Sequence, residues 1–312
     1  MTRYINIAIV ICLIILSGFK VQAQEAGPLT QKALKSMDSE DLNSGDIMRA
    51  RDQILIALKD EIESNAAFTW HAKGFIYKDI YKKIDKESRY SENREIAVDA
   101  ILRSMELDDT GYLSEANTKA MIFLSLSYFN DAVELLNNLN EENYEEPLKF
   151  YKRHRQLFQL CESDFDFRER DTEFYSNYGY QMKLFSDRSP SLKNILDPVA
   201  IAQYEQAVYI TPADTASNYN LAVIHYNRGV QKIRAINHQT EIFELIMIQE
   251  ECLKDFKLAL PYMIKTNELE PKDKDALLGL MAIYKALNND AESDKYRLEL
   301  ERLIKSGEIR KK

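Results

Sequence analysis

The sequence is poor in the residues that punctuate a chain with turns. Its 312 residues include 9 glycines and 7 prolines, which are too few for the many tight turns of an all-β domain of this length. Hydrophobic residues make up 45% of the chain, enough to bury a large core. The sequence therefore predicts an all-α protein.

The chain also lacks an excess of positive charge. Lysine and arginine number 41 against 50 aspartates and glutamates, giving a net charge of −9. A nucleic-acid partner would require a basic face to neutralise its phosphates. We interpret the short basic end at Arg310, Lys311 and Lys312 as a solvated tail, so we expect no nucleic-acid partner.

Signatures of catalysis or metal binding are missing as well. The four histidines, at positions 71, 154, 225 and 238, are scattered, and no metalloprotease, nucleophile-elbow, P-loop or zinc pattern occurs. The acidic segment from Cys161 to Glu173 has Glu169 where a calcium loop of the EF-hand type requires glycine. We therefore expect no enzyme, no cofactor and no bound metal.

The N-terminus has the layout of an export signal. Arg3 precedes an apolar run from Ile5 to Leu16, and Val21-Gln22-Ala23 forms a small-x-small cleavage site. The apolar run is shorter than the roughly 20 residues that span a bilayer, which disfavours the alternative of a single-pass anchor. We expect residues 1–23 to be a signal peptide, the mature protein to be periplasmic or secreted, and no stable membrane insertion after cleavage.

Cysteine is scarce in the part that follows. Cys12 lies within the apolar run, so the mature chain keeps Cys161 and Cys252. The two are far apart in sequence and match no small-domain disulfide spacing. The pattern favours two unpaired, partly buried thiols, with a bridge between them as the alternative.

The rest of the chain divides into a polar segment and a long helical one. Residues 24–45 contain Gly27, Pro28 and several serines, which predicts a flexible linker. From Ile47 onward apolar residues recur at spacings of three and four, as on one face of a helix. We therefore predict one helical domain over residues 46–312.

A repeat is visible around two prolines that lie 59 residues apart, Pro212 and Pro271. Small, apolar or aromatic residues occupy nearly all matching offsets, and Gln231 to Cys252 forms an excess that is itself helix-like, which predicts elongated helices. Such self-similarity is typical of repeat folds. The matching pairs are Tyr204 and Met263, Ala207 and Thr266, Leu221 and Leu280, Ala222 and Met281, and His225 and Tyr284.

An earlier segment has a related pattern, with Trp70, Lys73, Gly74 and Tyr77. Residues spaced by three, four and seven positions share one helix face. A bulky aromatic there packs beside a glycine, which lets the partner helix approach closely. We expect that partner helix to run from Glu95 to Leu107.

These patterns resemble the signature of tetratricopeptide-repeat proteins, of the exported kind with irregular repeats found in Gram-negative envelopes. The resemblance covers about Ile47 to Leu303 and departs from the family at Lys73, at Met281 and in the long insertions. It implies an α-α helical-hairpin solenoid, a tetratricopeptide-like superhelix with irregular, partly elongated helices. Structural roles would fall to Trp70, Gly74, Tyr77, Ala207, Pro212, Leu221, Ala222, Pro271, Leu280 and Tyr284.

The resemblance also implies a function, that of a non-enzymatic protein-protein interaction scaffold of the cell envelope that binds a peptide or partner protein. An envelope carrier of a glycan or small molecule is the alternative. The face that the resemblance assigns to the partner could instead be solvated or covered by neighbouring helices. The sequence does not indicate the partner or the oligomeric state. The candidate partner-binding residues are Phe68, His71, Phe75 and Lys78 in one unit, and Tyr219, Val223, Tyr226 and Asn227 in another.

Overall fold

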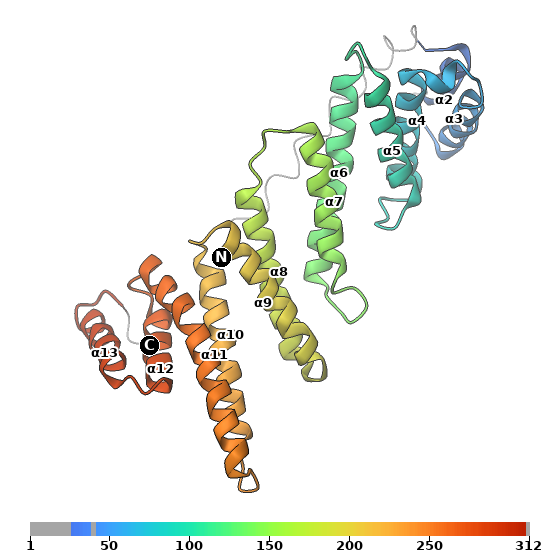
Figure 1. The fold of residues 1–312 in the computed structure, drawn as a ribbon. Coiled ribbons are helices and arrows are strands. Elements are labelled where there is room, and N and C mark those ends of the chain that lie inside the picture. Colours follow the sequence, from blue (N-terminus) through green and yellow to red (C-terminus); the bar gives the residue numbers. More distant parts are fainter. Residues whose placement is uncertain (1–25, 39–41, 310–312) are drawn as a thin grey trace. The chain divides into compact units, whose positions relative to one another are not determined.

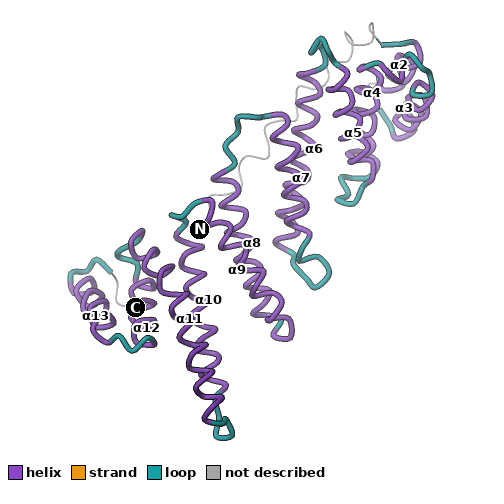
Figure 2. Tube along the Cα trace, viewed as in Figure 1, coloured by secondary structure: helices purple, strands orange, loops and turns teal. Residues whose placement is uncertain are grey.

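The computed structural model describes residues 26–38 and 42–309, and these ranges are helical with no β-strand (Figures 1 and 2). The predicted signal peptide and the basic tail lie outside the described residues. The α-helices are α2 (Pro28–Met37), α3 (Ser44–Ala57), α4 (Ala67–Asp79), α5 (Glu92–Leu107), α6 (Ser114–Asn137), α7 (Glu146–Cys161), α8 (Arg168–Arg188), α9 (Lys193–Ile210), α10 (Thr215–Ala235), α11 (Ile242–Leu269), α12 (Lys274–Ala286) and α13 (Asp290–Lys305).

The helices pack in neighbouring pairs. The densest contacts join α2 with α3, α4 with α5, α8 with α9, α10 with α11, and α12 with α13, which confirms the predicted all-α helical-hairpin fold. The predicted single domain forms two compact units. Unit 1 comprises the described residues up to 135 and residues 145–165, and unit 2 comprises residues 136–144 and the described residues from 166 onward.

In unit 1, the glycine of the repeat signature lies where two helices meet. A Cβ atom on Gly74 would lie 2.5 Å from Ile101 Cγ1 on α5, closer than packed atoms tolerate. The Trp70 Nε1 group donates a hydrogen bond to the Ser64 carbonyl oxygen at 2.8 Å. The close approach expected from the sequence is therefore present between α4 and α5.

The predicted flexible linker is wrong over most of its described part, because α2 forms there and buries Ala33 completely. The pair Gly27-Pro28, which suggested a loop, instead marks the start of a helix. Proline is tolerated there because the N–H group that it lacks would have no acceptor within the helix. Buried Glu63 accepts hydrogen bonds from the backbone N–H groups of Leu29 and Thr30 at 2.9 and 2.8 Å. A carboxylate from more than 30 positions away thus caps this helix.

A buried arginine joins α5 to α6. The Arg94 guanidinium lies 2.5 Å from Asp131 and 3.2 Å from the Ser127 hydroxyl, and its carbon lies 3.8 Å from the centre of the Tyr128 ring. Asp131, Ser127 and Tyr128 all lie on one continuous helix, α6.

Unit 2 repeats the close-packing device between its own pairs. A Cβ atom on Gly179 of α8 would lie 2.9 Å from the Tyr204 ring of α9, and one on Gly229 of α10 would lie 2.6 Å from the Phe256 ring of α11. Helices α10 and α11 have 21 and 28 residues, which confirms the predicted elongated helices.

The remaining expectations concern sulfur and membranes. Cys252 is buried and Cys161 half-buried, and both are free thiols, as the sequence favoured. Burial raises the pKa of the Cys161 thiol to about 11. Within residues 26–38 and 42–309, no helix combines the length and the apolar character needed to cross a membrane.

Candidate functional site

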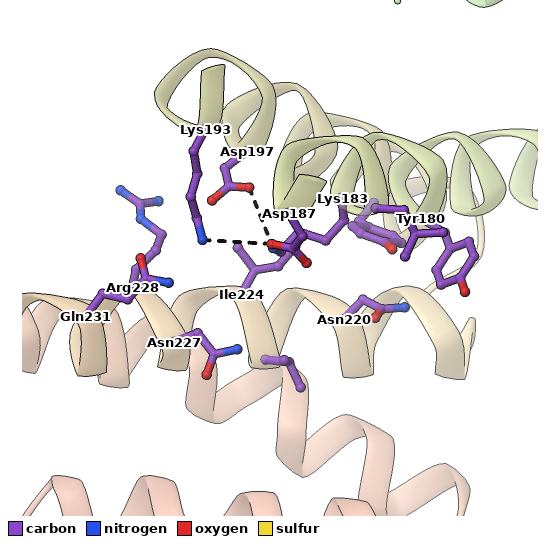
Figure 3. Close-up of a pocket in the computed structure, with 13 residues that line it drawn as sticks. Tyr180, Lys183, Asp187, Lys193, Asp197, Asn220, Ile224, Asn227, Arg228 and Gln231 are labelled. Carbon is purple, nitrogen blue, oxygen red and sulfur yellow. Dashed lines mark hydrogen bonds and ion pairs between the residues drawn. The ribbon is translucent and has the colours of Figure 1, made fainter. Parts of the chain in front are cut away.

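A cavity of about 300 Å³ lies in unit 2, between α8, α9 and the middle of α10 (Figure 3). Helix α9 starts five residues before Pro198, and this first part of the helix carries Lys193 and Asp197 of the lining. The lining consists of Tyr180, Lys183, Leu184 and Asp187 on α8, Lys193, Asp197 and Tyr204 on α9, and Asn220, Val223, Ile224, Asn227, Arg228 and Gln231 on α10.

The α8–α9 side of the cavity is held by a chain of polar contacts. Lys183 forms an ion pair with Asp187 and lies 3.8 Å from Asp197, while Lys193 lies 3.8 Å from Asp187 (Figure 3). The Ser186 hydroxyl donates to Asp197 at 2.6 Å. Both carboxylates are therefore already engaged by the protein's own donors.

The polar side chains on the α10 side of the cavity make fewer contacts within the protein. Asn227 is exposed and Arg228 has a 45% exposed side chain whose Nε atom is 4.0 Å from Asp255, the outer limit of an ion pair. The Asn220 amide donates to the Ala216 carbonyl at 2.9 Å, which leaves its own oxygen as an acceptor. This wall offers a cation and amide groups to an incoming ligand.

Tyr204 forms part of the cavity wall and is fully buried. Its hydroxyl has no hydrogen-bond partner within the described residues. Desolvation raises the pKa of this phenol, so it stays protonated. A buried hydroxyl without a hydrogen-bond partner lowers the stability of the folded state. This destabilising group lies in the wall of the cavity.

The structure places the first set of predicted partner-binding residues inside unit 1. His71, Phe75 and Lys78 are buried, and Phe68 is half-buried. The His71 ring contacts the Phe75 ring at 4.3 Å, and the Lys78 ammonium lies 4.6 Å from the centre of the same ring. Neighbouring helices thus cover this face of α4, which is the alternative that the sequence left open.

Burial also determines the protonation of His71. Its Nδ1 atom lies 2.8 Å from Asn117 Oδ1, and the Asn117 amide donates to Ser104 Oγ at 2.9 Å. The Asn117 oxygen therefore accepts from Nδ1–H. Desolvation, with a smaller contribution from nearby Lys78, lowers the pKa of His71 to about 4. The ring is a neutral part of the core.

The second predicted set divides between two sides of α10. Val223 and Asn227 line the cavity. Tyr226 contacts the Phe256 ring at 5.5 Å, and Tyr219 packs against the core formed with α11 and α12. The two tyrosines thus stabilise the α10–α11 pairing.

The α8 side chains of the cavity escaped the sequence analysis, although a signal for them existed. Phe75 and Lys78 follow the signature tryptophan by five and eight positions. Tyr175 precedes Gly179 on α8 by four positions, as Trp70 precedes Gly74 on α4. The same offsets from Tyr175 give Tyr180 and Lys183, and both line the cavity.

The described residues contain no cluster of three or more His, Cys, Asp or Glu side chains that could hold a metal ion. The acidic segment before α8 is mostly exposed and forms no such group.

Comparisons with known proteins leave the site to be judged from its own residues. No protein-family model matches the chain. No curated protein matches it at the level required for significance. Among solved structures, it is similar to a chain of the human IFIT1 dimer with PPP-AAAA, with 13% identity and a TM-score of 0.24, over 89% of this chain and 73% of that chain. A TM-score this low means that the two backbones do not superpose as wholes.

Proposed function

We propose that this protein is a non-enzymatic interaction scaffold that binds an extended peptide segment of a partner protein in the cavity between α8, α9 and α10. The observation that carries the proposal is the cavity itself, which opens between the first helices of two successive pairs. Stacked helix pairs commonly present such first helices as an extended binding surface.

The lining indicates an acidic peptide. Three cations, Lys183, Lys193 and Arg228, stand against two carboxylates, Asp187 and Asp197, and both lysines are paired with those carboxylates. The excess positive charge of the lining therefore lies at Arg228. A peptide carboxylate near Arg228 would gain a charge-assisted hydrogen bond. The amides of Asn227 and Gln231 match the donors and acceptors of an extended peptide backbone.

The cell envelope is the proposed location, because the predicted signal peptide at residues 1–23 would export the chain. We propose a scaffold rather than an enzyme since the lysines and carboxylates of the cavity are held in ion pairs with one another. Such groups position a ligand by charge and shape.

A selection from displayed random peptides tests the proposal. The chain from Gln24 onward should select peptides rich in aspartate and glutamate. The double variant Lys193→Glu with Arg228→Glu should bind them at least about tenfold more weakly, as expected for loss of charge-assisted contacts. The matched control is Lys254→Glu with Lys257→Glu, two exposed lysines on α11. Equal loss in both double variants, or no acidic preference, would contradict the proposal.

The cavity volume also keeps the alternative of a small-ligand carrier, since about 300 Å³ lies at the lower end of known ligand pockets. Thermal-shift measurements against oligosaccharides discriminate between the two. A dose-dependent rise in the melting temperature that Lys193→Glu abolishes, without selection of any peptide, would favour the carrier.

A further inference from the structure

One buried carboxylate of α11 lies within reach of two cations of α10. Lys232 forms an ion pair with Asp255 at 2.9 Å, and the Arg228 Nε atom lies 4.0 Å from the same carboxylate. The Asp255 side chain is only 6% exposed, and its Oδ2 atom accepts no hydrogen bond within the residues that the structure describes. Lys232 is therefore the close partner of Asp255, and Arg228 is a second cation that could replace it.

The two cations have different surroundings. Arg228 belongs to the lining of the cavity and has a 45% exposed side chain (Figure 3). Lys232 lies one turn further along α10, outside that lining, and its ammonium also pairs with Glu251 at 3.0 Å. Residues four positions apart share one face of a helix. Both cations can thus reach Asp255, but of the two only Arg228 can reach a ligand in the cavity.

Burial makes a cationic partner necessary for Asp255. A carboxylate removed from water keeps its charge only beside a charged or hydrogen-bonding partner. His225 of α10 also lies near this charge, but burial lowers the pKa of His225, so its ring is neutral at pH 7. Desolvation acts on Lys232 as well, yet the carboxylates of Asp255 and Glu251 raise its pKa. The lysine therefore stays charged and balances Asp255.

We propose that Lys232 is a positioning residue of the cavity, which pairs with Asp255 and thereby leaves the Arg228 guanidinium free for the carboxylate of a bound peptide. This role rests on the proposed function, since Arg228 carries the excess positive charge of the lining. Without Lys232, the buried carboxylate would attract Arg228, whose planar group can form two parallel hydrogen bonds with it. The cavity would then lose its free cation.

The reactivity of Arg228 tests this role without any ligand. Phenylglyoxal modifies guanidinium groups, and mass spectrometry of the digested chain gives the rate at each arginine. In the chain from Gln24 onward, Lys232→Met should slow modification of Arg228 about three- to fivefold, the factor expected for a partly exposed ion pair. Lys254→Met removes an exposed lysine of α11 beside Asp255 and should leave the rate unchanged.

A second substitution separates positioning from a general disturbance of the fold. Lys232→Met with Asp255→Asn removes the carboxylate that attracts Arg228, so the modification rate should return to that of the unaltered chain. Damage to the hairpin by loss of Lys232 would not be repaired by a further change in its core. Melting temperatures of the single and double variants show whether each remains folded.

Binding of a fluorescein-labelled hexaglutamate peptide extends the test to the cavity. Lys232→Met should weaken binding about three- to fivefold through the loss of the free Arg228. In the Arg228→Gln background the same substitution should have no further effect, because the residue through which it acts is absent. A change of net charge felt at long range would act equally in both backgrounds.

The outcomes distinguish the two proposals. An Arg228 rate unchanged by Lys232→Met, a reduced rate that Asp255→Asn does not restore, or equal effects of Lys232→Met on hexaglutamate binding in both backgrounds would each overturn the positioning role. Slower modification of Arg228 in Lys232→Met, together with no binding of hexaglutamate to the unaltered chain, would support the exchange of partners at Asp255 and contradict the proposed acidic peptide.

Discussion

The α4–α5 pair of unit 1 and the α10–α11 pair of unit 2 pack in the same way, but the outer face of α4 is covered and that of α10 is open. In each, a glycine lets the partner helix approach, Gly74 against Ile101 in one and Gly229 against Phe256 in the other. The remaining face of α4 is closed over His71 and Lys78. On α10 the corresponding face opens to a cavity, and residues 230–251 of the α10–α11 hairpin are exposed or half-exposed.

This difference separates two kinds of information in a helical repeat. The signature positions determine how two helices of one pair meet, because those contacts are local. What covers the outer faces depends on the neighbouring pairs and on insertions between them. Binding surfaces therefore have to be located from the helices that neighbour a pair. We call α4–α5 the closed pair and α10–α11 the open pair, and the predictions below concern each of them.

The largest change in the free energy of unfolding should come from unit 1, on replacing Arg94 of α5. Arg94→Ala leaves the buried Asp131 carboxylate without its partner and removes the guanidinium from the Tyr128 ring, and breaking a buried ion pair costs about 3 to 5 kcal/mol. Urea unfolding followed by circular dichroism measures the loss. The exposed Arg103→Ala is the control and should leave the free energy of unfolding almost unchanged; similar losses in both would contradict the role of the buried pair.

Acidification should affect the closed pair next. The folded pKa of His71 is about 4, below its ordinary value, so the unfolded chain binds a proton first as the pH falls. The stabilisation is complete above about pH 6.5 and is lost toward pH 4, on the order of 2 to 3 kcal/mol. Urea unfolding of His71→Gln should show a shallower decline over this range than the unaltered chain. His238→Gln, at an exposed position, should match the unaltered chain, and parallel curves for His71→Gln would refute the assignment.

The two glycines allow a direct comparison of the pairs. Gly74→Ala and Gly229→Ala each place a Cβ atom within 2.6 Å of a packed side chain, which should cost about 1 to 3 kcal/mol. In unit 1 the Cβ also lies 3.3 Å from the Ile101 backbone nitrogen, so we expect the larger loss at Gly74. Thermal melts measure it, with Trp70 fluorescence reporting on unit 1 and total helicity reporting on both units together. Gain of stability at either glycine would contradict the close packing.

The smallest effect concerns two tyrosines of unit 2. The Tyr178 hydroxyl donates to the Tyr144 carbonyl at 2.5 Å, whereas the Tyr204 hydroxyl has no partner in the described part of the chain. Tyr178→Phe should therefore cost about 1 kcal/mol, while Tyr204→Phe should be neutral or slightly stabilising. Chemical denaturation compares the two directly, and a larger loss for Tyr204→Phe would show that its hydroxyl makes a contact.

The sequence predicted what depends on local spacing. The pattern at Trp70, Gly74 and Tyr77 indicated the α4–α5 pairing, and the excess after Gln231 indicated the long hairpin. The sequence did not predict structure that depends on residues far away along the chain. Nothing near α2 revealed the Glu63 cap, which comes from beyond the next helix.

The candidate site was predicted in part for the same reason. Val223 and Asn227 follow from their offsets on α10, and they line the cavity. Lys193 and Asp197 do not, because they precede Pro198, and a proline commonly stands at the start of a helix. In the structure α9 begins five residues earlier, at Lys193, and Pro198 lies inside the helix, where it removes one backbone hydrogen bond.

Site-specific photo-crosslinking tests the central claim, that the open face of α10 and not the closed face of α4 receives the partner. A photoreactive phenylalanine analogue replaces either Asn227 or Phe68, and each variant is irradiated with an acidic peptide obtained by selection. The account predicts a crosslinked product from position 227 and none from position 68. Crosslinking from position 68 with none from position 227 would contradict it.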